Sequence, residues 1–198
     1  MTSPAPAPQQ LWNLPNILTM LRIVLVPFFI WSLLADASQH GVLRWIAFVL
    51  FAVAIYTDQL DGSIARKRNL ITDFGKIADP IADKLLTGAA LVLLSVLGEL
   101  PWWVTVLILV REWGITALRF VVIRYGVMPA SKGGKLKTVL QTVAILLYLF
   151  PLTPGTPVLA AIAFWIMVLA LAVTVVTGID YIAKAIRLRA SAVRGRSA

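Results

Sequence analysis

Long apolar runs broken by short polar segments divide this chain. A helix needs about 20 apolar residues to cross a bilayer, and several runs are that long. The polar breaks are rich in Gly, Pro, Asp or Lys, which are typical of turns between helices. We therefore predict an all-α integral membrane protein with six transmembrane helices, at about 16–35, 42–68, 74–97, 102–125, 135–150 and 158–183.

The two ends differ in composition from the helical region. Residues 1–10 are rich in Pro, Ala and Ser and lack a basic segment, which predicts a disordered tail rather than a cleaved signal peptide. Residues 11–185 form the predicted six-helix membrane domain, and residues 186–198 form a basic cytoplasmic tail.

Composition excludes several classes of protein. The 198 residues are 60% hydrophobic and only 14% charged, which is far from the composition of a soluble domain. The net charge is +9, but the basic residues flank apolar runs, so membrane lipids with anionic headgroups are expected partners and nucleic acid is not. Cysteine is absent and His40 is the single histidine, which excludes thiolate and His-based zinc sites.

The basic residues also predict the orientation. The polar segments after the second and fourth predicted helices and the C-terminal tail carry Lys and Arg, whereas the segments after the first, third and fifth helices carry neither. The positive-inside rule then places both termini on the cytoplasmic side of the cell inner (cytoplasmic) membrane. The turn after the second helix would face the cytoplasm as well.

Four of the nine acidic residues gather around that turn, at Asp58, Asp61, Asp79 and Asp83. The spacings of three and four residues place each pair on one helix face. Two such faces joined by a short turn would bring four carboxylates together, and hard divalent cations would relieve their repulsion. Ligands that are all oxygen favour Mg²⁺ or Mn²⁺.

The residues beside Asp61 suit a phosphorylated ligand. Gly62 and Ala65 are small, so a ligand could approach the backbone closely, and Arg66 could meet phosphate oxygens. Metal, space and positive charge together indicate phosphoryl chemistry. A structural polar cluster, or the ion site of a small cation transporter, is the alternative interpretation of these intramembrane acids.

The complete spacing is that of a known family. The pattern Asp58-x2-Asp61-Gly62-x2-Ala65-Arg66-x8-Gly75-x3-Asp79-x3-Asp83 resembles the signature of the CDP-alcohol phosphotransferases, whose six-helix architecture agrees with the predicted helix count. The resemblance implies that 11–185 is a catalytic domain that forms homodimers. It implies two divalent ions held among the four aspartates, with Asp83 as general base, and CDP contacts from the small and basic residues of the motif.

Three flanking segments narrow the resemblance. Residues 16–22, 111–116 and 132–138 resemble the branch of the family that uses sn-glycerol 3-phosphate as acceptor. That branch would transfer a phosphatidyl group from CDP-diacylglycerol to the acceptor and release CMP, with Asn16 and Thr19 as further CDP contacts. Inositol phosphate or phosphatidylglycerol, used by sibling enzymes, are the alternative acceptors.

Basic residues in the second half of the chain fit a phosphorylated acceptor. Glu112 and Arg119 are seven residues apart and share a helix face, with Arg111 adjacent and Lys135 and Lys137 following. We expect Arg111, Arg119, Lys135 and Lys137 to bind the acceptor phosphate.

Each of these polar residues also has a purely structural interpretation. Arg111 and Glu112 could form an ion pair that only orients helices. Lys135 and Lys137 could be anchors at the membrane surface, and Asn16, Thr19 and Arg22 could serve helix packing.

Overall fold

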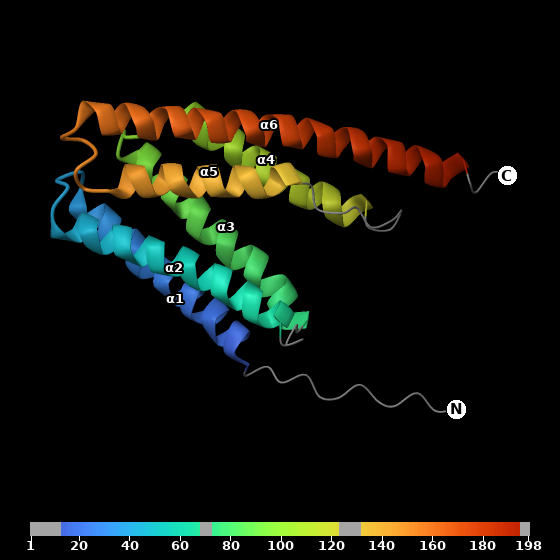
Figure 1. The fold of residues 1–198 in the computed structure, drawn as a ribbon, viewed down its shortest axis with the longest axis horizontal. Helices are drawn as coiled ribbons and strands as arrows, with labels where there is room; N and C mark the ends of the chain where they lie inside the picture. The colour runs from blue at the N-terminus through green and yellow to red at the C-terminus, as the bar shows by residue number, and fades with distance from the viewer. Residues whose placement is uncertain (1–12, 68–72, 123–131, 195–198) are drawn as a thin grey trace. The chain divides into compact units, whose positions relative to one another are not determined.

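A computed structural model describes residues 13–67, 73–122 and 132–194 of the chain, and these residues form helices and turns without a strand. The all-α prediction is therefore confirmed for this part of the chain. One helix corresponds to each predicted membrane span. The helices are α1 (Leu14–Asp36), α2 (Val42–Lys67), α3 (Asp73–Val96), α4 (Trp102–Val122), α5 (Lys132–Leu149) and α6 (Pro157–Arg194) (Figure 1).

Three helices, as far as the structure describes them, are long and apolar enough to cross a membrane. They comprise Leu14–Asp36, Val42–Leu60 and Pro157–Arg187. These helices identify a membrane protein. The count of six spans and the cytoplasmic placement of both termini stay predictions.

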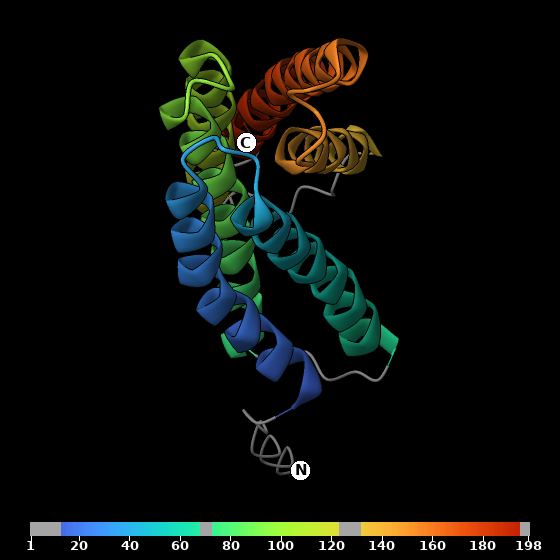
Figure 2. The ribbon, with the colours of Figure 1, turned by 90° about the vertical axis from the view of Figure 1, so that its left-hand side faces the viewer.

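The chain divides into two compact units, of which one ends at Leu93 and the other begins at Leu94. In the first unit α1 and α2 form an antiparallel pair, and α3 lies beside α1 (Figure 2). In the second unit α5 and α6 form an antiparallel pair, and α4 packs against α6 (Figure 1).

Side chains at the two ends of α1 hydrogen-bond to the backbone and define where the helix begins and ends. The Asn13 carboxamide accepts the backbone N–H of Asn16 at 2.9 Å and caps the start of the helix. At the other end the buried Asp36 carboxylate accepts the N–H groups of His40, at 3.1 Å, and Gly41, at 3.0 Å. The second set of bonds stabilises the turn into α2, so the two helices enter their antiparallel pairing in a defined register.

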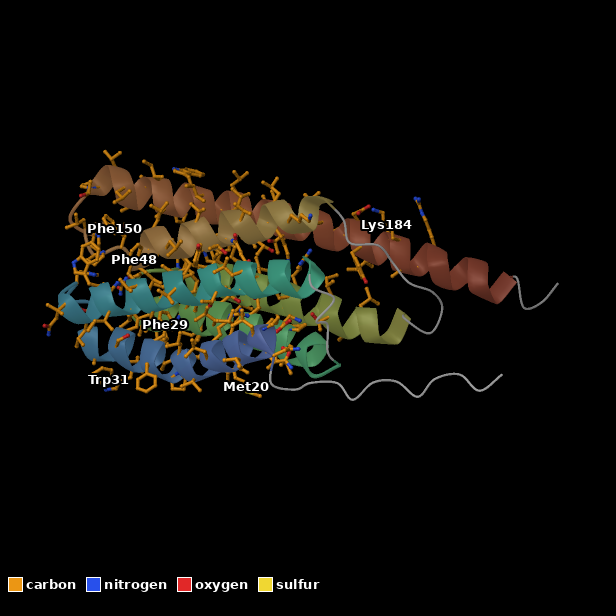
Figure 3. The ribbon with its side chains drawn as sticks, turned by 60° about the horizontal axis from the view of Figure 1, so that its bottom comes forward. Met20, Phe29, Trp31, Phe48, Phe150 and Lys184 are labelled. Carbon is orange, nitrogen blue, oxygen red and sulfur yellow. The ribbon has the colours of Figure 1, made fainter. Side chains whose placement is uncertain are left out.

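Apolar packing holds α1 against α2. Phe29 is fully buried, and its ring centroid lies 5.7 Å from that of Phe51. Met20 and Trp31 project outward from the same helix instead, and 62% of Trp31 is exposed (Figure 3). A helix with large apolar side chains on its outer face suits a lipid surrounding, where such exposure carries no hydrophobic penalty.

The last helix extends beyond the predicted span. Its span was expected to end near residue 183, and a basic tail was expected from residue 186. In the structure α6 continues without a break to Arg194. The described part of the predicted tail is therefore helical, because no Pro or Gly interrupts the chain between Gly178 and Arg194.

Candidate functional site

Two polar side chains of α1 reach the aspartates of the neighbouring helices in the first unit. Thr19 Oγ1 donates a hydrogen bond of 2.5 Å to Oδ1 of Asp79 on α3. One turn later, Nη1 of Arg22 lies 2.6 Å from Oδ1 of Asp58 on α2. Residues three apart on a helix share a face, so one face of α1 contacts both acidic helices. The structure thus brings Asp58 and Asp79 to a common neighbour.

Arg22 is almost completely buried, with 1% of its side chain exposed. Its Nε also donates to the backbone carbonyl of Ala54, one turn before Asp58, at 3.2 Å. A buried charge is tolerated when it is paired and hydrogen-bonded, and both conditions hold for this guanidinium. Arg22 is consequently a fixed positive charge at the acidic end of α2.

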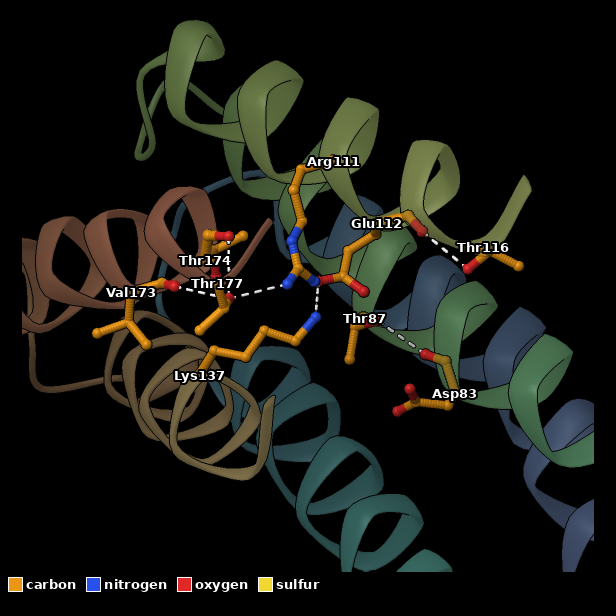
Figure 4. Close-up of polar contacts among 9 residues, drawn as sticks. All are labelled: Asp83, Thr87, Arg111, Glu112, Thr116, Lys137, Val173, Thr174 and Thr177. Atoms are coloured by element: carbon orange, nitrogen blue, oxygen red, sulfur yellow. Dashed lines mark hydrogen bonds and ion pairs between the residues drawn. The ribbon is translucent and has the colours of Figure 1, made fainter. Parts of the chain in front are cut away.

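The carboxylates themselves interact. Asp79 lies near enough to Asp58 for the two negative charges to repel each other. Asp83 follows one turn after Asp79 on α3; it is half-buried, and its backbone carbonyl accepts the hydroxyl of Thr87 at 2.8 Å (Figure 4). Carboxylate oxygens that repel one another are the donor set that a hard divalent cation binds. Asp58 and Asp79 thus supply oxygens of the kind that such an ion binds, and a complete ligand set would need further groups.

The full four-aspartate site is not seen as one cluster. Asp61 belongs to α2, but its side chain lies outside the described residues, and so do those of Gly62, Ala65 and Arg66. Among the side chains that the structure places, no three acidic or histidine groups come close enough together to hold a metal ion. The two-ion site and the CDP contacts of the motif remain predictions.

The two expected CDP contacts on α1 have structural roles in the described geometry. Asn16 is buried, with 2% exposed, and its backbone N–H is bound by the cap residue. The Thr19 hydroxyl donates to Asp79 and lies 3.1 Å from the carbonyl of Pro15. Their contact with CDP is untested.

A second cluster of charges lies in the second unit, where three helices contribute to it. Nη1 of Arg111 on α4 donates to Oε1 of Glu112 at 3.0 Å, and Nζ of Lys137 on α5 binds the same oxygen (Figure 4). Nη2 of Arg111 donates to the hydroxyl of Thr177 on α6 at 2.9 Å. The side chains of Arg111, Glu112 and Lys137 are 14%, 23% and 12% exposed. Two cations thus share one carboxylate in a largely buried position.

A glycine makes room for this arrangement. A Cβ atom at Gly178 would lie 3.2 Å from both Cγ and Nε of Arg111, so the arginine lies directly across the backbone of α6. Glycine permits this close approach of a side chain to the helix. Thr177 and Gly178 were not singled out from the sequence; the signal that could have revealed them is that Gly178 is the one glycine of α6 and directly follows a threonine.

The structure describes the side chains of three of the four predicted acceptor residues. Arg111 and Lys137 meet at Glu112, as expected for a common anion site. Lys135 is exposed, and residues two apart on a helix do not face the same way, so it lies on another face of α5 than Lys137. The side chain of Arg119 is outside the described residues.

Comparison with known proteins identifies related sequences over most of the chain. Residues 12–176 match the CDP-alcohol phosphatidyltransferase family. A probable phosphatidylglycerophosphate synthase of Mycobacterium tuberculosis is 53% identical over 175 residues, which cover 88% of this chain and 82% of that protein. The CDP-diacylglycerol–glycerol-3-phosphate 3-phosphatidyltransferase of Bacillus subtilis is 38% identical, with 88% and 95% covered. The enzyme of the same name from Rickettsia felis is 39% identical, with 85% and 93% covered.

Proposed function

The chain belongs to the CDP-alcohol phosphatidyltransferase family, and we propose that it transfers the phosphatidyl group of CDP-diacylglycerol to sn-glycerol 3-phosphate, giving phosphatidylglycerol phosphate and CMP. The observation that carries this assignment is the similarity to phosphatidylglycerophosphate synthases along nearly the whole chain, together with the complete aspartate motif. Identity at this level over most of both chains supports a common reaction.

The aspartates of the first unit are the proposed site for the diphosphate of CDP-diacylglycerol. The family generally works with divalent metal ions, and Mg²⁺ or Mn²⁺ would be held among Asp58, Asp61, Asp79 and Asp83. Bound there, the ions would neutralise the diphosphate and the charge that develops on the departing CMP. Gly62, Ala65 and Arg66 would contact the CDP group, with Asn16 and Thr19 near the start of α1.

The chemical step exchanges the phosphoanhydride bond of the diphosphate for a phosphoester bond. The acceptor hydroxyl oxygen forms a bond to the phosphorus that carries diacylglycerol, and the bond from that phosphorus to the CMP oxygen breaks. Asp83 would take the hydroxyl proton as general base. A carboxylate is a weak base, so its contribution would come mainly from its position beside the attacking oxygen.

The charged cluster of the second unit suits the phosphate of the acceptor. Arg111 and Lys137 supply two cations against the single charge of Glu112, which leaves a net positive charge for an incoming anion. An uncharged acceptor would not need this excess. Arg119 would extend the positive charge around the same ligand, and Lys135, on another face of α5, would add to the positive potential nearby without contacting it.

Six membrane spans, with both termini and the active site on the cytoplasmic side, complete the proposal. The distribution of Lys and Arg supports this orientation, and both substrates then reach the site from the side where nucleotides and glycerol phosphate are found. A homodimer within the cytoplasmic membrane is expected from the family.

An acceptor panel tests the proposed function directly. Purified protein with radiolabelled CDP-diacylglycerol and Mg²⁺ should release CMP when sn-glycerol 3-phosphate is added, and chelation of the metal should stop the release. The panel also contains inositol phosphate and phosphatidylglycerol. Faster turnover with either of those would overturn the proposed acceptor while keeping the family reaction.

A further inference from the structure

Thr19 and Arg22 lie on one face of α1, and the proposed reaction does not explain why both contact aspartates. Each residue engages one oxygen of one aspartate: Thr19 binds Oδ1 of Asp79, and Arg22 binds Oδ1 of Asp58. A carboxylate has two oxygens with about four acceptor positions, so each aspartate keeps capacity for a further ligand. These contacts can therefore orient the two carboxylates and still leave oxygen positions that a cation can bind.

The two contacts differ in charge. The Thr19 hydroxyl is neutral and can only orient Asp79. Arg22 brings a full positive charge to a place where Asp58 and Asp79 repel each other. It cannot move away easily, because its side chain is 1% exposed and its Nε is hydrogen-bonded to Ala54. The guanidinium therefore stabilises the paired carboxylates when no metal is bound, and repels a metal that arrives.

We propose that Arg22 is a positioning residue that acts as a built-in counter-ion for Asp58 in the metal-free protein and limits how tightly a divalent cation binds, while Thr19 orients Asp79 for that cation. This inference rests on the proposed function in one respect, namely that the aspartates hold a divalent ion. It predicts opposite effects for the two residues: loss of the charge at position 22 tightens metal binding, and loss of the hydroxyl at position 19 weakens it.

The first experiment titrates Mn²⁺ into the purified full-length protein. Bound Mn²⁺ is counted by electron paramagnetic resonance, and the thermal midpoint is followed in parallel. Arg22→Gln should lower the midpoint of the metal-free protein and bind Mn²⁺ about tenfold more tightly, because a unit charge that opposes the metal is gone. The rise of the midpoint on adding Mn²⁺ should therefore be larger than in the unchanged protein.

Arg44 provides the matched control. Arg44 lies on α2 and, like Arg22, is buried. It precedes Asp58 by 14 residues, which is about 21 Å along a helix. Arg44→Gln should lower the midpoint equally with and without Mn²⁺ and leave the Mn²⁺ affinity unchanged. If Arg22→Gln behaves in the same way as Arg44→Gln, Arg22 only supports the fold and the inference is wrong.

Thr19→Val gives a second and independent measurement. Valine keeps the shape of threonine and removes the hydrogen bond to Asp79, so the Mn²⁺ dissociation constant should rise about threefold. If Arg22→Gln does not accumulate as folded protein, this variant decides, and an unchanged dissociation constant overturns the inference.

The outcomes also separate this inference from the proposed metal site. If the wild-type protein binds no Mn²⁺, both the metal site and the positioning role are rejected. If the wild-type protein binds Mn²⁺ and both variants bind it with the same affinity, the positioning role alone is rejected.

Discussion

The aspartate region of the first unit and the charged cluster of the second unit are built with opposite signs on the same plan. Among the side chains that the structure describes, Asp58, with Asp79 nearby, is paired with Arg22, whereas Arg111 and Lys137 are both paired with Glu112. Each set of like charges is thus partly neutralised by one residue of opposite charge. Such a residue keeps the like charges together before a ligand arrives.

The two accompanying residues differ in how firmly they are held. The side chain of Arg22 is 1% exposed and that of Asp58 is 37% exposed, so the positive charge lies deeper than the carboxylate with which it pairs. Glu112 is 23% exposed and is more accessible than Arg111 and Lys137, at 14% and 12%. The difference teaches that a cation held in the proposed metal site would have to coexist with Arg22, whereas a phosphate in the proposed acceptor site would compete with the more exposed Glu112 for Arg111 and Lys137.

The largest expected effect is a loss of turnover when the proposed general base in the aspartate region of the first unit is replaced. Asp83→Asn should lower CMP release at least about 100-fold, because the amide cannot accept the proton of the acceptor hydroxyl. The thermal midpoint should change little. Asp180→Asn is the control: Asp180 is an exposed acid paired with Lys184 at 2.7 Å, and its loss should leave turnover unchanged. Retained turnover in Asp83→Asn would exclude Asp83 as the base.

A smaller but clear effect is expected from the cations of the second unit. Lys137→Met should raise the KM for sn-glycerol 3-phosphate about tenfold, because a charged hydrogen bond to the phosphate is lost. The KM for CDP-diacylglycerol should stay nearly constant. Lys184→Met, an exposed lysine of α6, is the control and should change neither value. Equal changes in both KM values would show that Lys137 supports the fold rather than the acceptor.

Removing the charge of Glu112 should change the KM for sn-glycerol 3-phosphate in the direction opposite to the loss of Lys137. Glu112→Gln should lower the KM for sn-glycerol 3-phosphate about threefold, since the phosphate no longer competes with a carboxylate for Arg111 and Lys137. Inorganic phosphate should also inhibit the variant at lower concentration. A raised KM would mean that Glu112 organises the two cations and is not displaced by the ligand.

The smallest effect concerns the backbone beneath Arg111. Gly178→Ala would place a methyl group 3.2 Å from Cγ and Nε of that arginine, so its side chain must shift. We expect the KM for the acceptor to rise about threefold with little change in kcat. Gly114→Ala is the matched control, because a Cβ atom there meets nothing within 4 Å and should leave the KM unchanged.

Much of the architecture could be predicted from local patterns. Apolar runs and the polar breaks between them located each helix that the structure describes, because helix formation and membrane insertion both respond to contiguous composition. The continuation of α6 to Arg194 was missed, since the prediction ended that helix where its apolar span ended. A helix need not stop at the membrane surface.

The contacts within the sites were less accessible to sequence reasoning. The motif spacing named the aspartates, but the pairing of Arg22 with Asp58 joins residues that are 36 positions apart on separate helices. Such pairings depend on the register between α1 and α2, which tertiary packing decides. The different faces of Lys135 and Lys137 could have been read from helical periodicity alone.

The length of α6 has a mechanical consequence. Its 38 residues extend about 57 Å, whereas the hydrocarbon core of a bilayer is about 30 Å thick. About half of this rod must therefore stand in the headgroup layer or the adjoining water, or lie steeply inclined. Because Thr177 and Gly178 belong to the same helix, a pull of anionic headgroups on its basic end would be transmitted to the backbone that Arg111 contacts.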